Sequence, residues 1–368
     1  MDTKIKREVD LGAYRELMVR IGSKRLYTPN KAIEHRPGAS NSPFRYANRL
    51  HKTPAPIELV DYRIYIKPRA LEEFKQNIDY VYTVFKDVRL FETKPVVLAS
   101  PYFVLSNGGA PVEEHFELLA NMYATILGNH RFRNNILMLP GLMYERGRKA
   151  NVSIFTKYIS DLLNVLAEYG VSGGKNMIGY IPNSIKSDEL LRNILASYIE
   201  NEIFHFSIDI YGGDSYSLAN RAFLLRVIRL LRNFIEKELD IVPYIHILNV
   251  NAKGKDDTFP AKDFLSSFLS ISTFSFDTLP KGGGTDKNII PYKKFDTNDF
   301  NYHKLRIRRG YQNKLKAENG ILMVDEFRRM RKMGDKDIGQ YISSKSGFRS
   351  LQQDIIDFSK EMNQSTLL

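Results

Sequence analysis

Between residues 94 and 277 the chain alternates short apolar runs with longer amphipathic stretches, and this alternation limits its fold more than any other feature. The runs are almost continuously apolar, as strands covered on both faces are; they read PVVLAS, NNILMLP, NMIGYIP, FHFSIDI, YIHILNV and STFSFD. Repeated strand–helix units pair their strands in parallel through right-handed crossovers. The pattern predicts an α/β fold with a (β/α)8 TIM-barrel-like domain of roughly 200–250 residues. A doubly wound open sheet is the alternative.

The stretches between the runs have the period of amphipathic helices; they include VEEHFELLANMYATIL, SIFTKYISDLLNVLAEYG, SDELLRNILASYIENE and ANRAFLLRVIRLLRNFIEKEL. In SDELLRNILASYIE the apolar residues recur at i, i+3 or i+4, and i+7. Ser187 stands before two acidic residues there, which is typical of a helix start. We therefore expect helices between the strands.

The two flanks differ from this middle part. The first contains Pro- and Arg-rich loops such as HRPGASNSPFRYANRLHKTPAPIE, and the last is polar and basic. We expect three regions: an N-terminal extension of mixed structure at 1–93, the core of the α/β barrel at 94–288, and a basic C-terminal helical region at 289–368.

Composition narrows the setting. The chain has no Cys, so disulfides and thiolate metal sites are excluded, and its seven His lack metal-binding spacing. We expect no metal and no cofactor. The charged N-terminus is not a signal peptide, and no apolar run reaches about 20 residues, so we expect a cytoplasmic protein with no membrane partner. The formal net charge of +12 favours polyanionic partners, nucleic acid first, against the plainer interpretation of a charged, solubilising surface.

Residues directly after the strands of such barrels lie on the catalytic face. This rule selects a mostly polar set with few carboxylates: Ser100, Tyr102, Pro140, Gly141, Asn183, Ser184, Asp209, Gly212, Gly213, Asn249, Asn251 and Asp277. The chain shows no convincing Ser/His/Asp order and no phosphate-binding P-loop.

The segment FSFDTLPKGGGTDKN places one carboxylate, Asp277, between an apolar run and a basic glycine-rich loop. FDTLPKGGGTDKN resembles the segment of tRNA-guanine transglycosylases in which an aspartate follows Phe at a barrel strand end. Upstream, RLYTPNKAIE, FHFSIDIYGGD, PYIHILNV and AKDFLSSFLSISTFSFD are similar to family segments in the same order. The resemblance covers about Arg25 to Asn288 and is close only around Asp277.

The chain also departs from that family. Ala99 and Ser100 stand where the family has an Asp-Ser-Gly segment that holds guanine, and Pro140 and Gly141 stand near its second base-reading aspartate. The family's zinc cluster of cysteines and histidine cannot form here. Base recognition is therefore changed, or the chain is a DNA-modifying relative or a non-catalytic paralogue.

The resemblance implies a base exchange at guanine in tRNA or DNA, with a 7-deazaguanine-type base as the incoming partner. Asp277 would attack C1′ and form a covalent glycosyl-enzyme; in the plain interpretation it is a turn residue. Asp209, Asn183, Ser100 and the two glycines would contact the substrate. Lys281 and Lys287 would hold its phosphates.

Two basic segments are candidates for holding a polyanion. HKLRIRRGYQNKLK interleaves Lys304, Arg306, Arg308 and Arg309 with a tyrosine, which offers charge and a stacking ring. A second stripe, formed by Arg221, Arg226, Arg229 and Arg232, lies on one side of a predicted helix, where an ordinary solvated face is the favoured interpretation. The alternatives to an enzyme on nucleic acid are a non-catalytic nucleic-acid-binding barrel protein or subunit and a small-molecule barrel enzyme. A homo-oligomer is left open.

Overall fold

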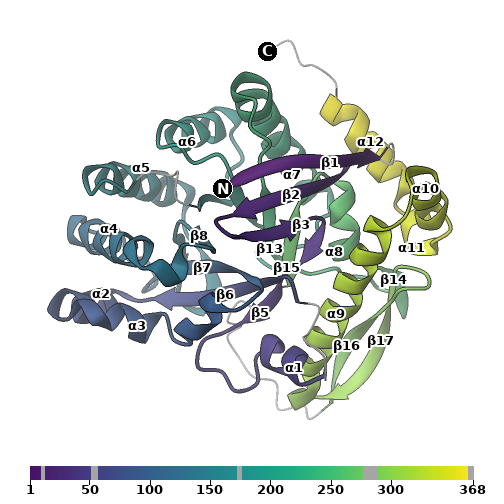
Figure 1. The fold of residues 1–368 in the computed structure, drawn as a ribbon, viewed down its shortest axis with the longest axis horizontal. Helices are drawn as coiled ribbons and strands as arrows, with labels where there is room; N and C mark the ends of the chain where they lie inside the picture. Colours follow the sequence, from purple (N-terminus) through teal and green to yellow (C-terminus); the bar gives the residue numbers. More distant parts are fainter. Residues whose placement is uncertain (10–12, 51–56, 172–175, 277–288, 364–368) are drawn as a thin grey trace.

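The computed structural model describes residues 1–9, 13–50, 57–171, 176–276 and 289–363 (Figure 1). Its centre is a mostly parallel sheet, with helices along the outer side and two smaller antiparallel sheets beside it. The α/β class and the parallel strand pairing predicted from the alternating pattern are confirmed. Among the described helices, none has the length and apolar character that crossing a membrane requires.

The parallel strands follow one another in nearly the order of the chain. They are β4 (Asn30–Lys31), β5 (Ile33–His35), β6 (Leu59–Ile66), β7 (Val96–Leu105), β8 (Ile136–Met138), β11 (Met177–Pro182), β12 (Phe206–Asp209), β13 (Ile245–Val250) and β15 (Thr273–Phe276). Each pairs in parallel with the next from β5 to β15. β15 then pairs in parallel with β4, which only Ala32 separates from β5. Residues 30–35 thus contact both β15 and β6.

Helices connect these strands. They are α1 (Pro43–Leu50), α2 (Pro68–Gln76), α3 (Val81–Val84), α4 (Glu113–Gly128), α5 (Val152–Glu168), α6 (Asp188–Glu200), α7 (Leu218–Leu231) and α8 (Lys262–Leu265). Figure 1 shows α2, α4, α5, α6 and α7 along the outside of the sheet. The helix start predicted at Ser187 is confirmed, because its hydroxyl accepts a hydrogen bond from the amide of Leu190 at 3.3 Å.

The predicted boundary at residue 94 needs correction. Three segments of the parallel sheet, β4, β5 and β6, lie within the stretch expected to be an N-terminal extension. Their sequences, NK, IEH and LVDYRIYI, contain charged residues, yet nearly all of these residues are buried. The sheet therefore begins at Asn30.

A separate antiparallel sheet near the start of the chain consists of β1 (Asp2–Val9), β2 (Tyr14–Ile21) and β3 (Lys24–Tyr27). Several of its contacts are with the chain just before the parallel strands. Lys24 donates to the carbonyl of Pro95, before β7, at 2.8 Å and to the side chain of Asn135, before β8, at 3.0 Å. Thr3 donates to the carbonyl of Val242, before β13. This sheet therefore lies at the amino ends of the parallel strands.

The C-terminal region combines strands and helices. β16 (Ile289–Asp296) and β17 (Asn301–Arg308) form a hairpin that pairs with β14 (Thr258–Pro260). The helices that follow are α9 (Gln312–Arg331), α10 (Asp335–Ser343), α11 (Ser346–Arg349) and α12 (Gln352–Asn363). The remaining pair is β9 (Gly141–Tyr144) and β10 (Arg148–Lys149). β9 pairs in parallel with the carboxyl-terminal half of β7, and β10 pairs antiparallel with β9. The region at 289–368, expected to be helical, therefore begins with a hairpin.

The arginine stripe of α7 has an internal role. Arg221 pairs with Asp354 of α12, and Arg229 donates to the carbonyl of Glu361 on the same helix. Arg226 pairs with Asp188 at the start of α6 at 2.9 Å. The stripe therefore holds α12 and α6 against α7, which leaves the other basic segment as the candidate for binding a polyanion.

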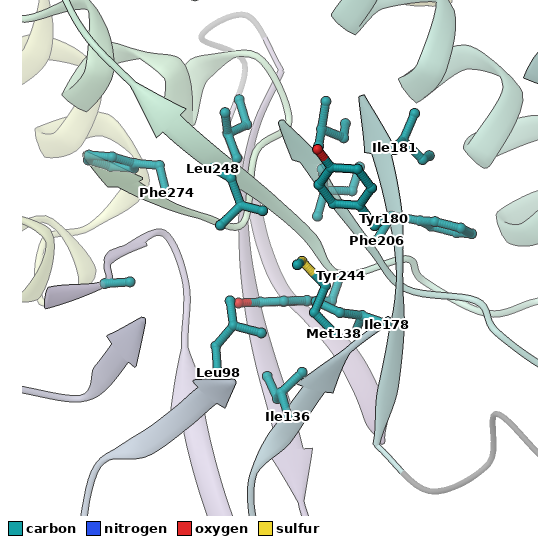
Figure 2. Close-up of a cluster of buried hydrophobic side chains, with 14 of the residues drawn as sticks. Leu98, Ile136, Met138, Ile178, Tyr180, Ile181, Phe206, Tyr244, Leu248 and Phe274 are labelled. Carbon is teal, nitrogen blue, oxygen red and sulfur yellow. The ribbon is translucent and has the colours of Figure 1, made fainter. Parts of the chain in front are cut away.

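The apolar core lies among the parallel strands and between them and the helices. Figure 2 shows part of it, with labelled side chains from β7, β8, β11, β12, β13 and β15; some lie among the strands, and others, such as Phe206, point away from them. Phe206 is fully buried and packs on Tyr198 of α6, with ring centroids 5.5 Å apart. A side chain at Gly179 would meet the Phe206 ring at 2.8 Å, so β11 and β12 need a glycine there to pack closely.

Candidate active site

An ion pair lies buried among the carboxyl-terminal halves of the parallel strands. Arg63 of β6 is only 2% exposed, and its Nε donates to Asp61 Oδ2 at 2.7 Å. The same guanidinium donates to Ser275 Oγ at 2.7 Å, to the carbonyl of Phe276 at 3.2 Å and to the Asn249 side chain. Burial is the largest single effect and would raise the pKa of Asp61, but the charges and hydrogen bonds around this carboxylate, the charge of Arg63 first among them, together lower that pKa. The cluster thus ties β6 to β13 and β15.

Asp209, at the end of β12, is also buried and fully hydrogen-bonded. Its Oδ1 accepts from the Asn249 side chain and from the amide of Tyr211, both at 2.8 Å. Its Oδ2 accepts from the hydroxyls of Tyr102 at 3.0 Å and Tyr180 at 3.1 Å. Two carboxylate oxygens offer about four acceptor positions, and these four donors use them. The predicted contact between Asp209 and a substrate therefore does not fit this arrangement.

A cavity of about 840 Å³ opens at the carboxyl ends of β5, β6, β13 and β15. The hairpin β16–β17, the first turns of α9 and the loop before α1 complete its wall. Its described lining carries several cations and one acid: Arg36, Arg63, Lys253, Lys293, Lys304, Lys316 and Glu34. This is the end of a parallel sheet where α/β barrels place their active sites. A ligand with negative charge fits such a lining.

Glu34 is the acid in this wall, and it is 2% exposed. Its Oε1 accepts from Lys31 Nζ and from the amide of Phe276. Among the described residues its Oε2 is buried without a hydrogen-bond partner. A buried carboxylate oxygen without a partner is costly, so Glu34 is a natural acceptor for a hydrogen bond from a ligand.

Asn251, directly after β13, lines the cavity, but the residues predicted from the sequence to bind the substrate lie outside its described lining. Ser100 is buried and donates to Asp61 Oδ1 at 2.8 Å. Asn183 accepts from Lys149 Nζ at 2.8 Å and donates to Asn220 at 2.9 Å. The amides of Gly212 and Gly213 donate to the carbonyls of Asn249 and Ile210, respectively. Their assignment as substrate-binding residues stays a prediction without support from this geometry.

The predicted basic residues divide into two groups. Lys304 lines the cavity, and Arg306 and Arg308 are exposed further along β17. Asp277, Lys281, Lys287 and the side chain of Arg309 lie outside the described residues. Phe276, the residue directly before Asp277 in the sequence, lines the cavity.

Sequence reasoning missed Glu34, Arg36, Lys253 and Lys316. Glu34 and Arg36 belong to KAIEHRPG, in which a Pro-Gly pair follows a short stretch that contains apolar residues. A Pro-Gly pair commonly marks a turn after a strand. Recognising that run as a strand would have placed both residues on the catalytic face. Lys316 is on α9, and no local pattern connects it to the strand ends.

One group of described residues has the composition of a metal site: Asp296, Asp299 and His303, beside the turn of the hairpin β16–β17. The three side chains are partly exposed. Exposed acidic groups of this kind are common without a metal ion. They carry no assignment here.

Known proteins give little guidance. No protein-family model matches the chain, and no curated protein matches it. The catalytic domain of an endo-β-1,4-mannanase from Bacillus sp. JAMB-750 is 12% identical, with 80% of this chain and 86% of that chain covered and a TM-score of 0.44. The 3-dehydroquinate dehydratase from Geobacillus kaustophilus HTA426 is 12% identical, with 73% and 89% covered and a TM-score of 0.36. The alkaline cellulase K catalytic domain is 12% identical, with 76% and 83% covered and a TM-score of 0.39. At this identity and structural overlap, the similarities carry no argument about activity.

Two buried histidines, His205 and His246, should make the free energy of unfolding depend on pH. Burial lowers the pKa of His205 and of His246 from 6.5 to about 3. Below pH 6.5 each histidine binds a proton in the unfolded chain but not in the folded one, and this favours unfolding. The contribution of each histidine to stability is therefore fully present above pH 6.5 and is lost as the pH falls toward 3. Between pH 6.5 and 5 we expect a loss of about 2 kcal/mol per histidine. Urea unfolding measured at several pH values checks this.

His246→Gln should reduce the loss of stability between pH 6.5 and 5 by the contribution of this histidine, about 2 kcal/mol, whatever it does to stability at pH 7.5. His130→Gln, a change at an exposed histidine, is the matched control and should leave the dependence unchanged. Burial raises the pKa of Asp209, so protonation of this carboxyl stabilises the folded state at low pH and opposes the effect of the histidines. This contribution is expected to be the same in both variants. An unaltered pH dependence in His246→Gln would show that His246 is not held neutral in the folded state.

Proposed function

We propose that this chain is a base-exchange enzyme of the transglycosylase type, which acts on guanine in tRNA or DNA at the cavity. One observation carries the proposal: the cation-rich cavity lies at the carboxyl ends of the strands, and Phe276 in its wall directly precedes Asp277 in the sequence. The cations suit a phosphate backbone. The volume of about 840 Å³ is that of a pocket for a small ligand.

A closed (β/α)8 barrel is the framework that we propose for this site. Residues 30–35 pair with β15 through β4 and with β6 through β5. With β4 and β5 taken as one strand, eight parallel strands follow in chain order, and a helix comes after each: α1, α2, α4, α5, α6, α7, α8 and α9. Pairing on both sides of one strand is what closure of a sheet requires.

In the proposed reaction the Asp277 carboxylate attacks C1′ of the target nucleotide, and the bond from C1′ to the base breaks. The incoming base, of the 7-deazaguanine type, then attacks C1′ and releases the aspartate. Glu34 Oε2 is the available acceptor for an N–H group of the bound base. The reaction needs no metal and no cofactor. Over the whole exchange the leaving base gains one proton and the incoming base loses one.

The hairpin β16–β17 supports the phosphate-binding part of the proposal. Lys304, Arg306 and Arg308 alternate along β17 and therefore share one face of the strand. Lys293 is directly opposite Lys304 on β16, and both line the cavity. Successive cations on one face are about 7 Å apart. This row therefore leads from the cavity outward as a track for a polyanion.

A non-catalytic nucleic-acid-binding protein or subunit is the second candidate. The observation that favours it is that two buried carboxylates near the strand ends are already engaged: Asp61 is paired with Arg63, and Asp209 accepts four hydrogen bonds. Such a protein would bind nucleic acid with the same salt dependence and exchange no base. A small-molecule enzyme with a phosphate-bearing substrate would bind no nucleic acid at physiological salt.

Replacement of the proposed nucleophile tests the chemistry. Asp277→Ala should abolish the exchange of radiolabelled guanine, or of a 7-deazaguanine, into tRNA or DNA, because no covalent glycosyl-enzyme can form. Binding of the nucleic acid should persist. Asp256→Ala, which removes an exposed carboxylate from the loop after β13, is the control and should exchange at the wild-type rate. Exchange at the wild-type rate by Asp277→Ala would exclude this residue as the nucleophile.

The track on β17 has a separate test. Changing Lys304, Arg306 and Arg308 together to Ala should reduce the slope of log K against log salt by about 0.7–0.9 for each phosphate contact, or by about two to three in total. The matched control changes three exposed cations of the outer helices, Arg69, Lys75 and Lys157. Equal slopes for the two triple variants in a salt titration would place the nucleic acid on another surface.

A further inference from the structure

A second polar group lies in the wall of the same cavity, at the side where β5 ends and α1 begins. His35 Nδ1 is 2.9 Å from Ser42 Oγ, and His35 Nε2 is 3.0 Å from Asp87 Oδ2. Ser42 and His35 line the cavity, and each is 2% exposed. A serine, a histidine and an aspartate joined in this order are the parts of a nucleophilic triad.

The partners of the imidazole ring decide where its proton is. The Asp87 carboxylate can only accept, so neutral His35 carries its proton on Nε2 and donates it to Asp87. Its Nδ1 is then the acceptor for the hydroxyl of Ser42. Burial, the largest cause, lowers the pKa of His35 and keeps the ring neutral near pH 7. The ring is therefore in the form that removes a proton from serine.

Packing holds this geometry in place. The His35 ring lies against Phe44, with centroids 5.3 Å apart, and against Tyr62, with centroids 5.6 Å apart. Arg45 pairs with Asp87 at 3.3 Å from the other side. Asp87 has a φ of 60°, a conformation that non-glycine residues adopt rarely. The three side chains are thus held in place by β5, by the start of α1 and by the segment that contains Asp87.

The start of α1 suits a reaction in which negative charge develops at the serine. Ser42 directly precedes Pro43, the first residue of the eight-residue helix. Pro43 has no N–H group, and the amide of Tyr46 donates to the Ser42 carbonyl. The first-turn amides that remain are therefore those of Phe44 and Arg45. The helix dipole favours negative charge at this end. A tetrahedral oxyanion at Ser42 would form beside those amides.

We propose that Ser42, His35 and Asp87 form a second catalytic site, which hydrolyses carboxylic esters that carry an anionic group. Ser42 Oγ bonds to the acyl carbon while its proton moves to His35 Nδ1; the ester C–O bond breaks and the leaving alcohol takes that proton. Water then attacks the acyl-serine, gives one proton to His35, and the acid leaves as Ser42 regains its proton. The anionic group is held by cavity cations such as Arg36 and Lys253. Ser42 and His35 are the catalytic residues, and Asp87 is a positioning residue.

A fluorophosphonate probe tests this site independently of base exchange. Ser42 Oγ should attack phosphorus and displace fluoride, so that peptide mass spectrometry of the full chain finds the phosphonyl group on Ser42. A known serine hydrolase labelled in parallel shows that the probe is active. Failure of the folded wild-type chain to be labelled at Ser42, or labelling only at other residues, would overturn the proposal.

Variants separate catalysis from a structural role. Ser42→Ala should eliminate this label, and His35→Gln should slow labelling by about 100-fold or more, whereas Ser106→Ala, at an exposed serine, should label as the wild type does. Asp87→Asn should slow labelling as well. It should also move the acidic limb of the pH–rate profile to lower pH. The reason is that Asp87 raises the pKa of His35 whereas Arg45 lowers it, so removal of the Asp87 charge lowers the pKa of His35 further. An unchanged profile and rate in Asp87→Asn would refute the role of Asp87.

Discussion

The ion pair between Arg63 and Asp61 is the interaction on which the carboxyl end of the sheet depends. Arg63 reaches from β6 to Asn249 on β13 and to Ser275 and the Phe276 carbonyl on β15, and β13 and β15 both end at the cavity. A buried ion pair costs desolvation, and here the additional hydrogen bonds offset that cost. Loss of one partner would leave a buried charge without compensation, at a cost of about 3–5 kcal/mol. The floor of the cavity is therefore polar but internally satisfied, which leaves binding to the cations and Glu34 around it.

The six strands found in the sequence, β7, β8, β11, β12, β13 and β15, are those whose residues are almost all apolar, and they are where the structure has them. The parallel strands of the main sheet that were missed before β7, namely β4, β5 and β6, contain Lys31, Glu34, Asp61 and Arg63, all buried. Hydrophobic periodicity cannot reveal a strand whose inward side chains are charged, because the pattern contains no sign that the charges will find partners inside. The error in the domain boundary follows from this single cause.

The candidate site was less predictable than the fold. The strand-end rule selected the face of the sheet where the cavity opens, but residues that it selected, such as Ser100 and Asp209, are engaged within the protein. The cavity wall instead takes residues from the hairpin and from α9, and their positions depend on how the C-terminal region packs. Likewise, Ser42 and Asp87 are far apart in the sequence and meet only through His35. Side-chain contacts of this kind are set by tertiary packing, which no local pattern encodes.

A crystal structure of the protein with a short guanine-containing oligonucleotide would show whether the cavity at the carboxyl ends of β5, β6, β13 and β15 receives a nucleotide. We expect one nucleotide within the cavity, with its base against Glu34 and the neighbouring phosphates along Lys304 and Arg306. An oligonucleotide bound to the outer helices, with the cavity left without a nucleotide, would contradict this expectation.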